Sequence, residues 1–323
     1  MPNNHHPRWK RGDVHYTRTA YAPVMERGPY AHYRHLIPDD SDASVHLFRE
    51  NHQRLLTAEM IARGLLPYAV VSNWNYTLHD IGHSYRVCDN VNMVLDMLPV
   101  DRRPGPRGIE ILYQAALLHD VGMAFLSRDK ERGIGMTHGE LSATLIRTIS
   151  ERPYLNDGFS TLGSAEHVDA LCTVVSSHCM GLHGDGSGSP CFDDIGETVS
   201  VDGEVVRLRM LCAVLCIADG LDMGRNRIPD TVYDILTDRV VLVTLSDIVG
   251  SQSVPYLGER SRHHWEMESH TTVDVVRGDG TVVIIGTDSP EEMSERRGLK
   301  AYLEYYFDVL GLDAEVVVGS EWG

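Results

Sequence analysis

Between about Ser41 and Asp219, apolar residues recur every three or four positions, which is the spacing of amphipathic helices. This period predicts a helical bundle. The helices are expected to run from about Ser41 to beyond Ile61, from about His83 to Leu98, from Ile109 to His119, from Thr137 to Ile149, from Ser164 to His178 and from Leu208 to Asp219. The third helix is apolar on nearly every side near its end, so it is expected at the centre of the bundle.

Local signals predict where these helices begin and end. Asp80 is a predicted N-terminal cap, and Thr137 with Glu140 has the spacing of a capping box. Pro67 is expected to lie beyond the first helix, and Pro99 is expected to end the second. The polar, Gly-rich segment 181–203 is expected to be a long loop.

After about Asp238 the pattern changes to that of strands. Strands are expected at 240–243, 271–276, 281–285 and 314–318, with the middle two joined as a hairpin and a helix from about Ser289 to Leu310 before the last. The sequence therefore predicts a mainly α protein with a small C-terminal α+β appendage. Its expected parts are an N-terminal arm (1–40), a helical domain (41–236) and the α+β subdomain (237–323).

Charge and cysteine content limit the function classes. The 323 residues carry a formal net charge of -17, which argues against general nucleic-acid binding but leaves a small anionic substrate open. The six cysteines form no C-x-x-C pair and no apolar run could span a membrane, so a reduced, cytoplasmic protein without a membrane partner is expected. The sequence leaves open whether the chain forms a homo-oligomer. The basic arm 1–40 is expected to wrap its own domain or a partner subunit, or else to bind a ligand.

Side chains of the metal-binding type lie on the inward face near one end of five expected helices. They are His83, His119 with Asp120, His138, His178 and Asp219. A single histidine on an apolar face is commonly a core residue with a satisfied hydrogen bond. Two aspartates and several histidines buried together need a common charge to neutralise them, and a divalent metal ion is the usual one.

Three of these segments resemble the motifs of the HD-domain metal-dependent phosphohydrolases. The matching stretches are Gly82–Val87, Leu118–Met123 and Ile217–Asp219, which hold the first histidine, the adjacent His-Asp pair and the closing aspartate. The resemblance covers about residues 42–235 and implies an HD-type helical bundle.

The resemblance also implies a set of ligands. In the wider family one divalent metal ion would be bound by the residues that match His83, His119, Asp120 and Asp219. Members with two further histidines bind a second ion, and the positions here are His138 and His178, with Asp120 as the bridge. Such a ligand set suits Fe, Mn, Co or Zn, with Mg as a further option. Many members carry a lysine where this chain has Met123, so no lysine-assisted step is expected.

Basic side chains near these motifs are the candidates for contacts with a phosphate group. The candidate substrate-binding residues are Arg86, Arg128, Lys130 and His183, and the candidate catalytic residues are Asp120, His79, Arg225 and Arg227. His79 lies in the loop before the second helix and is expected to face the substrate or to support a ligand. The arginines could instead be solvated or salt-bridged, and His183 could be an exposed loop residue.

These inferences favour hydrolysis of a phosphomonoester or phosphodiester by metal-activated hydroxide, with a nucleotide as the favoured substrate. Two alternatives stay open. A di-iron oxygenase could use the same ligands, and a sensor could bind a nucleotide without turning it over.

Overall fold

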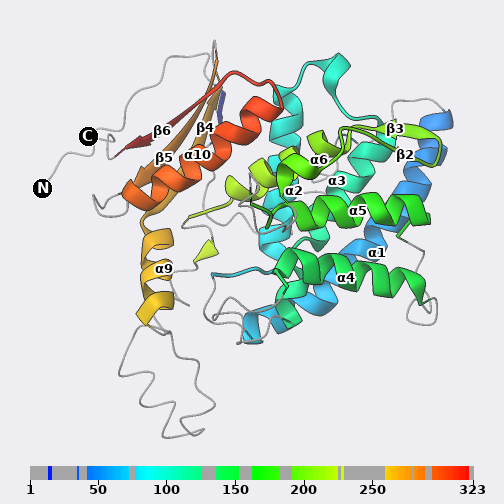
Figure 1. Ribbon diagram of the computed structural model, residues 1–323, viewed down its shortest axis with the longest axis horizontal. Coiled ribbons are helices and arrows are strands. Elements are labelled where there is room, and N and C mark those ends of the chain that lie inside the picture. Colours follow the sequence, from blue (N-terminus) through cyan, green and yellow to red (C-terminus); the bar gives the residue numbers. More distant parts are fainter. Residues whose placement is uncertain are drawn as a thin grey trace, which may run out of the picture.

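The computed structural model describes residues 14–16, 35, 42–72, 77–125, 136–152, 162–181, 191–224, 227–228, 259–277, 280–287 and 293–319. Helices form a bundle on one side, and a small sheet made largely of C-terminal strands lies on the other (Figure 1). The predicted mainly α fold with an α+β appendage is therefore confirmed. No described helix is both long enough and apolar enough to cross a bilayer.

Two largely buried helices, α3 (Pro106–Leu118) and α6 (Leu208–Gly220), form the centre of the bundle. Around α3 pack α1 (Asp42–Ser72), α2 (Ile81–Met97) and α5 (Ala165–Ser177), and α4 (His138–Glu151) packs on α5. Because α3 ends inside the bundle, the polar residues that follow it are buried as well: His119 is 0% exposed and Asp120 is 2% exposed.

Pro67 lies inside α1, so the expectation that the first helix ends before it was wrong. A proline in a helix interior costs about 3 kcal/mol because it removes a hydrogen bond and crowds the preceding turn. Beyond the proline, Ala69 is buried against Met123, in the 3-10 turn η4 (Val121–Phe125) that follows α3. Tertiary packing of this last turn therefore keeps the helix intact.

The predicted caps are confirmed. Asp80 Oδ1 accepts a hydrogen bond from the His83 backbone N–H at 2.9 Å, and Thr137 and Glu140 form both hydrogen bonds of the capping box. The third helix begins at Pro106 rather than at Ile109, because proline suits a first helical position, where no backbone donor is needed.

The expectation of a loop through residue 203 was wrong for its second half. Residues 182–190 lie outside the described residues, but a 3-10 turn η7 (Phe192–Asp194) and a hairpin of β2 (Val199–Val201) and β3 (Glu204–Val206) follow. Asp202 and Gly203 form the turn with φ of 50° and 82°. Two positive φ angles are what a two-residue hairpin turn requires, and Asp-Gly is a favoured pair for it.

The C-terminal sheet has the strand order β1-β4-β5-β6. Strands β4 (Thr271–Arg277) and β5 (Thr281–Thr287) form the predicted antiparallel hairpin, after helix α9 (Glu259–Ser269). Helix α10 (Met293–Val309) then crosses over to β6 (Ala314–Gly319), which is parallel to β5. The backbone of β1 (Val14–Tyr16) pairs with β4, so part of the N-terminal arm joins the sheet. The predicted strand 240–243 lies outside the described residues.

Helix α10 lies between the sheet and the bundle (Figure 1). Leu303, Tyr306 and Phe307 of α10 are buried, and the Tyr306 ring centroid is 4.8 Å from that of Phe192. The same helix packs on α6, so the bundle and the sheet share one hydrophobic core.

Candidate metal centre

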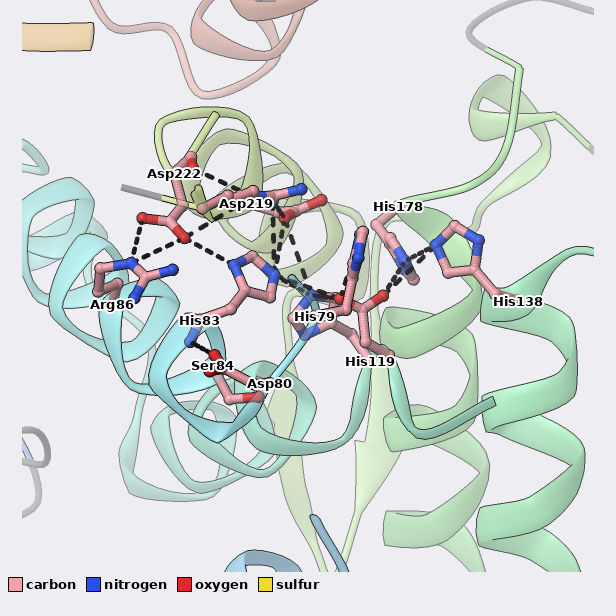
Figure 2. A network of polar contacts seen from close by, with 12 residues as sticks. His79, Asp80, His83, Ser84, Arg86, His119, His138, His178, Asp219 and Asp222 are labelled. Atoms are coloured by element: carbon pink, nitrogen blue, oxygen red, sulfur yellow. Dashed lines mark hydrogen bonds and ion pairs between the residues drawn. The ribbon is translucent and has the colours of Figure 1, made fainter. Parts of the chain in front are cut away.

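Side chains from the ends of five helices meet in one buried cluster (Figure 2). The sequence predicted these residues from helical periodicity, and the structure brings all of them together. They are His83 in the first turn of α2, His119 and Asp120 directly after α3, His138 at the start of α4, His178 directly after α5, and Asp219 in the last turn of α6.

One half of the cluster contains His83, His119, Asp120 and Asp219. The Nε2 atoms of His83 and His119 are 3.0 Å apart. His83 Nε2 is 3.2 Å from Asp120 Oδ2 and 3.3 Å from Asp219 Oδ1, and His119 Nε2 is 3.0 Å from Asp120 Oδ2. Four donor atoms from three helices thus converge on a single point.

The other half contains His138 and His178, whose Nε2 atoms are 3.0 Å apart. They face the second oxygen of Asp120: His138 Nε2 is 3.4 Å and His178 Nε2 is 3.6 Å from Asp120 Oδ1. Asp120 therefore directs one carboxylate oxygen to each half of the cluster, as a carboxylate that bridges two cations would.

The opposite ring nitrogens fix the orientation of these imidazoles. His119 Nδ1 bonds the Ala116 carbonyl at 3.1 Å and His178 Nδ1 bonds the Val175 carbonyl at 2.6 Å. A carbonyl can only accept, so Nδ1 of each ring carries a proton, and Nε2 is the ring nitrogen that faces the cluster. This arrangement is the usual one around histidines that bind metals.

The turn that carries His119 and Asp120 is held tightly against α4. Ser142 Oγ accepts from the Gly122 N–H at 2.7 Å and donates to the His119 carbonyl at 2.6 Å. A Cβ atom on Gly122 would overlap the His138 carbonyl oxygen and would lie 2.5 Å from the Ser142 nitrogen. The glycine of the HD-x-G turn is therefore what lets the two halves of the cluster approach.

The electrostatics of the cluster favour a cation. Burial alone would raise the pKa of Asp120 and Asp219, but the facing basic groups, His119 for Asp120 and Arg227 for Asp219, hold both well below their usual value. Burial and Arg227 lower the pKa of His83, yet the three aspartates that it faces, Asp120, Asp219 and Asp222, raise it to about 10. The carboxylates thus create a strongly negative potential in a buried place.

A divalent ion fits this cluster on two grounds. Asp120 Oδ2 is buried without a hydrogen-bond partner among the described residues, which is costly unless a cation binds it. Imidazole and carboxylate donors also suit Fe, Mn, Co and Zn. Three groups of donor atoms lie close enough to hold an ion: His83, His119 and Asp120; His119, His178 and Asp219; and His138, His178 and Cys179.

Arg86 and Arg227, predicted to contact substrate, both make ion pairs at the first half of the cluster. Arg227 Nη2 is 2.6 Å from Asp219 Oδ1 and 3.4 Å from His83 Nε2. Arg86 Nε donates to both oxygens of Asp222, at 2.9 Å and 3.1 Å. Both guanidinium groups therefore lie at the edge of the centre, and each has a carboxylate partner.

His79 lies beside the shared aspartate. Its Nε2 is 4.0 Å from Asp120 Oδ2, and its Nδ1 bonds the Thr77 carbonyl at 2.5 Å. Burial lowers the pKa of His79 to about 3. A neutral imidazole with Nδ1 protonated therefore presents Nε2, an acceptor, to the centre.

Four predicted site residues lie outside the described residues: Arg128, Lys130, His183 and Arg225. Two residues that the sequence did not single out belong to the cluster. Asp222 accepts a hydrogen bond from His83 Nδ1 at 2.6 Å, and Cys179 Sγ is 3.1 Å from His138 Nε2. Each stands near a predicted ligand in the sequence, three residues after Asp219 and one after His178, and this proximity is the signal that could have found them.

Asp222→Asn is expected to weaken metal binding by about 10- to 100-fold at the first half of the cluster. The amide keeps the shape but loses the charge that holds His83 Nδ1–H and Arg86 in place. Calorimetric titration of the metal-free protein would measure the affinity at each position, and the second position should be unchanged. Equal affinities of variant and native protein at the first position would contradict this role.

A family model described as HD-CE matches residues 75–308, a range that contains every donor named above. No curated protein matches the chain.

Proposed function

The chain belongs to the HD-CE family and so has an HD-like domain, and we propose that it is a metal-dependent hydrolase of phosphomonoester or phosphodiester bonds. Nucleotides are the substrate class that we favour. The proposal includes a centre of two divalent ions, a small anionic substrate and a cytoplasmic location. It extends the family assignment, which by itself supports an HD-like domain with a metal-binding His and Asp cluster.

The observation that carries the proposal is that the two carboxylate oxygens of Asp120 face two different pairs of imidazoles. Asp120 Oδ2 is 3.2 Å from His83 Nε2, and Asp120 Oδ1 is 3.4 Å from His138 Nε2. A pair of ions that share one carboxylate suits phosphoester hydrolysis, because the developing charge lies on several oxygens at once.

The charges around the centre also favour an anionic substrate. With the imidazoles neutral, as they must be to bind metal, Asp120, Asp219 and Asp222 outnumber the guanidinium groups of Arg86 and Arg227, which leaves a net negative charge. Two divalent cations reverse this sign. A phosphate group would then bind at a locally positive place on a protein whose net charge is -17.

When bound, the ions would supply Lewis acidity and a hydroxide at neutral pH. Within the protein, His79 Nε2 is placed to accept a proton beside Asp120, and the Thr77 carbonyl keeps the other ring nitrogen protonated. Arg227, buried next to Asp219, adds positive charge where a phosphate oxygen would bind. Met123 is buried with Ala69, so the position of the lysine found in many HD-domain phosphohydrolases is apolar here.

Phosphate release tests the proposal. Chelator-treated protein should release no phosphate from a panel of phosphomonoesters, phosphodiesters and nucleotides, and added Mn²⁺, Co²⁺, Zn²⁺ or Fe²⁺ should restore turnover of at least one of them. His119→Ala should abolish this activity, whereas His263→Ala, on an exposed part of α9, should keep it.

Two other outcomes would replace the proposal. Oxygen consumption by the iron-loaded protein together with substrate, without phosphate release, would identify a di-iron oxygenase on the same ligands. Tight binding of a nucleotide without turnover would identify a sensor.

A further inference from the structure

Cys179 lies within bonding range of the same point as the second pair of histidines. Its Sγ is 3.1 Å from His138 Nε2 and 3.3 Å from His178 Nε2, and the three donor atoms form a group that could hold a metal ion. Asp120 Oδ1 also lies near both imidazoles, at 3.4 Å and 3.6 Å. One sulfur, two nitrogens and one oxygen are thus the candidate donors at this position.

The turn after α5 places two consecutive side chains at this point. Cys179 N–H donates to the Ser176 carbonyl at 3.3 Å and Met180 N–H to the Ser177 carbonyl at 3.1 Å, so the chain tightens directly after the helix. The start of α4 comes close because residue 139 is glycine: a Cβ there would be 3.1 Å from both Cys179 Sγ and His178 Cε1. The backbone conformation after α5 and the glycine at the start of α4 therefore bring Cys179 into contact with the two histidines.

We propose that Cys179 is a thiolate ligand of the second metal position, together with His138, His178 and Asp120. A tetrahedral ion with bonds of about 2.0–2.3 Å separates its donors by about 3.3–3.6 Å. Five donor separations are seen here, those among His138, His178 and Cys179 and those from Asp120 to the two imidazoles, and they run from 3.0 Å to 3.6 Å. When the thiol binds, its proton is released to the solvent.

This ligand set makes the two positions chemically different. The first offers only nitrogen and oxygen donors, whereas the second adds a soft sulfur donor, which favours Zn²⁺ or Co²⁺ over Mn²⁺ or Mg²⁺. The inference rests on the metal centre of the proposed function. It adds that this centre is asymmetric and that the second position selects thiophilic ions.

Absorption spectroscopy of the cobalt-substituted protein tests the inference without any activity measurement. Titration of the metal-free protein with Co²⁺ should produce a thiolate-to-cobalt charge-transfer band in the near ultraviolet. Cys179→Ser should abolish the band. The matched control Cys172→Ser should keep it, because Cys172 lies in the buried face of α5, where its Sγ donates to the Ala143 carbonyl, and a hydroxyl can make the same bond.

A second measurement uses the native chain and so does not depend on whether a variant folds. Iodoacetamide should alkylate Cys179 in the metal-free protein, and bound Zn²⁺ should protect it by at least about tenfold, as peptide mass spectrometry would show. Binding of Co²⁺ without a charge-transfer band, or a band that survives in Cys179→Ser, would overturn the thiolate ligand and leave the metal centre in place. Failure to bind Co²⁺ at all would overturn the metal centre of the proposed function, and the thiolate ligand with it.

Discussion

Asp120→Asn is expected to abolish metal-dependent turnover and to weaken both metal positions together. Asp120 faces all four imidazoles of the ligand set, at 3.0 Å and 3.2 Å on one oxygen and 3.4 Å and 3.6 Å on the other. Loss of a residue that only hydrogen-bonds a metal ligand lowers metal affinity by about 10- to 100-fold. Loss of Asp120, an anionic ligand that both ions share, should therefore lower metal affinity by more than about 100-fold. Elemental analysis after desalting would measure bound metal, and phosphate release would measure turnover.

Asp169→Asn is the matched control for this prediction. Asp169 lies on α5, and its side chain is 67% exposed and pairs with Arg147 on the surface. This control should keep both ions and full activity. If Asp120→Asn lost only one of the two ions, the shared role of Asp120 would be wrong.

Gly122→Ala is expected to lower the free energy of unfolding by about 3 kcal/mol, the upper part of the usual range for overpacking. The two nearest atoms that a new Cβ would meet are the His138 oxygen and the Ser142 nitrogen of the backbone, and the third is the Leu141 Cβ, so no side-chain rotation relieves the overlap. Because the same turn carries His119 and Asp120, metal affinity should fall as well. Urea denaturation of the metal-free protein would separate the loss of stability from the loss of metal.

The same substitution at Gly298 is expected to raise, rather than lower, the free energy of unfolding. Gly298 lies in α10, and a Cβ there would meet no atom within 4 Å. Alanine should therefore stabilise the helix by about 1 kcal/mol through its higher helix propensity. A loss of stability in Gly122→Ala no larger than the change in Gly298→Ala would show that the turn can relax.

Periodicity and capping chemistry were sufficient to predict the helices, because both are local properties of the chain. Asp80 and the Thr137–Glu140 pair cap their helices as predicted. The prediction failed at Pro67, where packing of Ala69 on Met123 overrides the local preference. It also failed at Asp202–Gly203, because this two-residue hairpin turn lies in a polar, Gly-rich segment whose composition predicts a loop.

The candidate ligands could be predicted for a different reason. A buried helix face that ends in a charged or titratable residue is unusual, and the coincidence on five helices pointed to a common partner. The supporting residues could not be predicted in the same way. Asp222 and Cys179 acquire their partners, His83 and His138, only through contacts between helices far apart in the sequence.

The packing of α10 against α6 has a consequence for how the chain can be divided. Gly220, the neighbour of the candidate ligand Asp219, would bring a Cβ within 3.2 Å of Leu303 and 3.3 Å of Tyr302, so α10 fits directly against the backbone that carries this carboxylate. A fragment that ends at residue 236 would lack α10, would lose its packing behind the candidate ligand Asp219, and would expose the apolar side of α6. A fragment that keeps this support for Asp219 has to extend through α10.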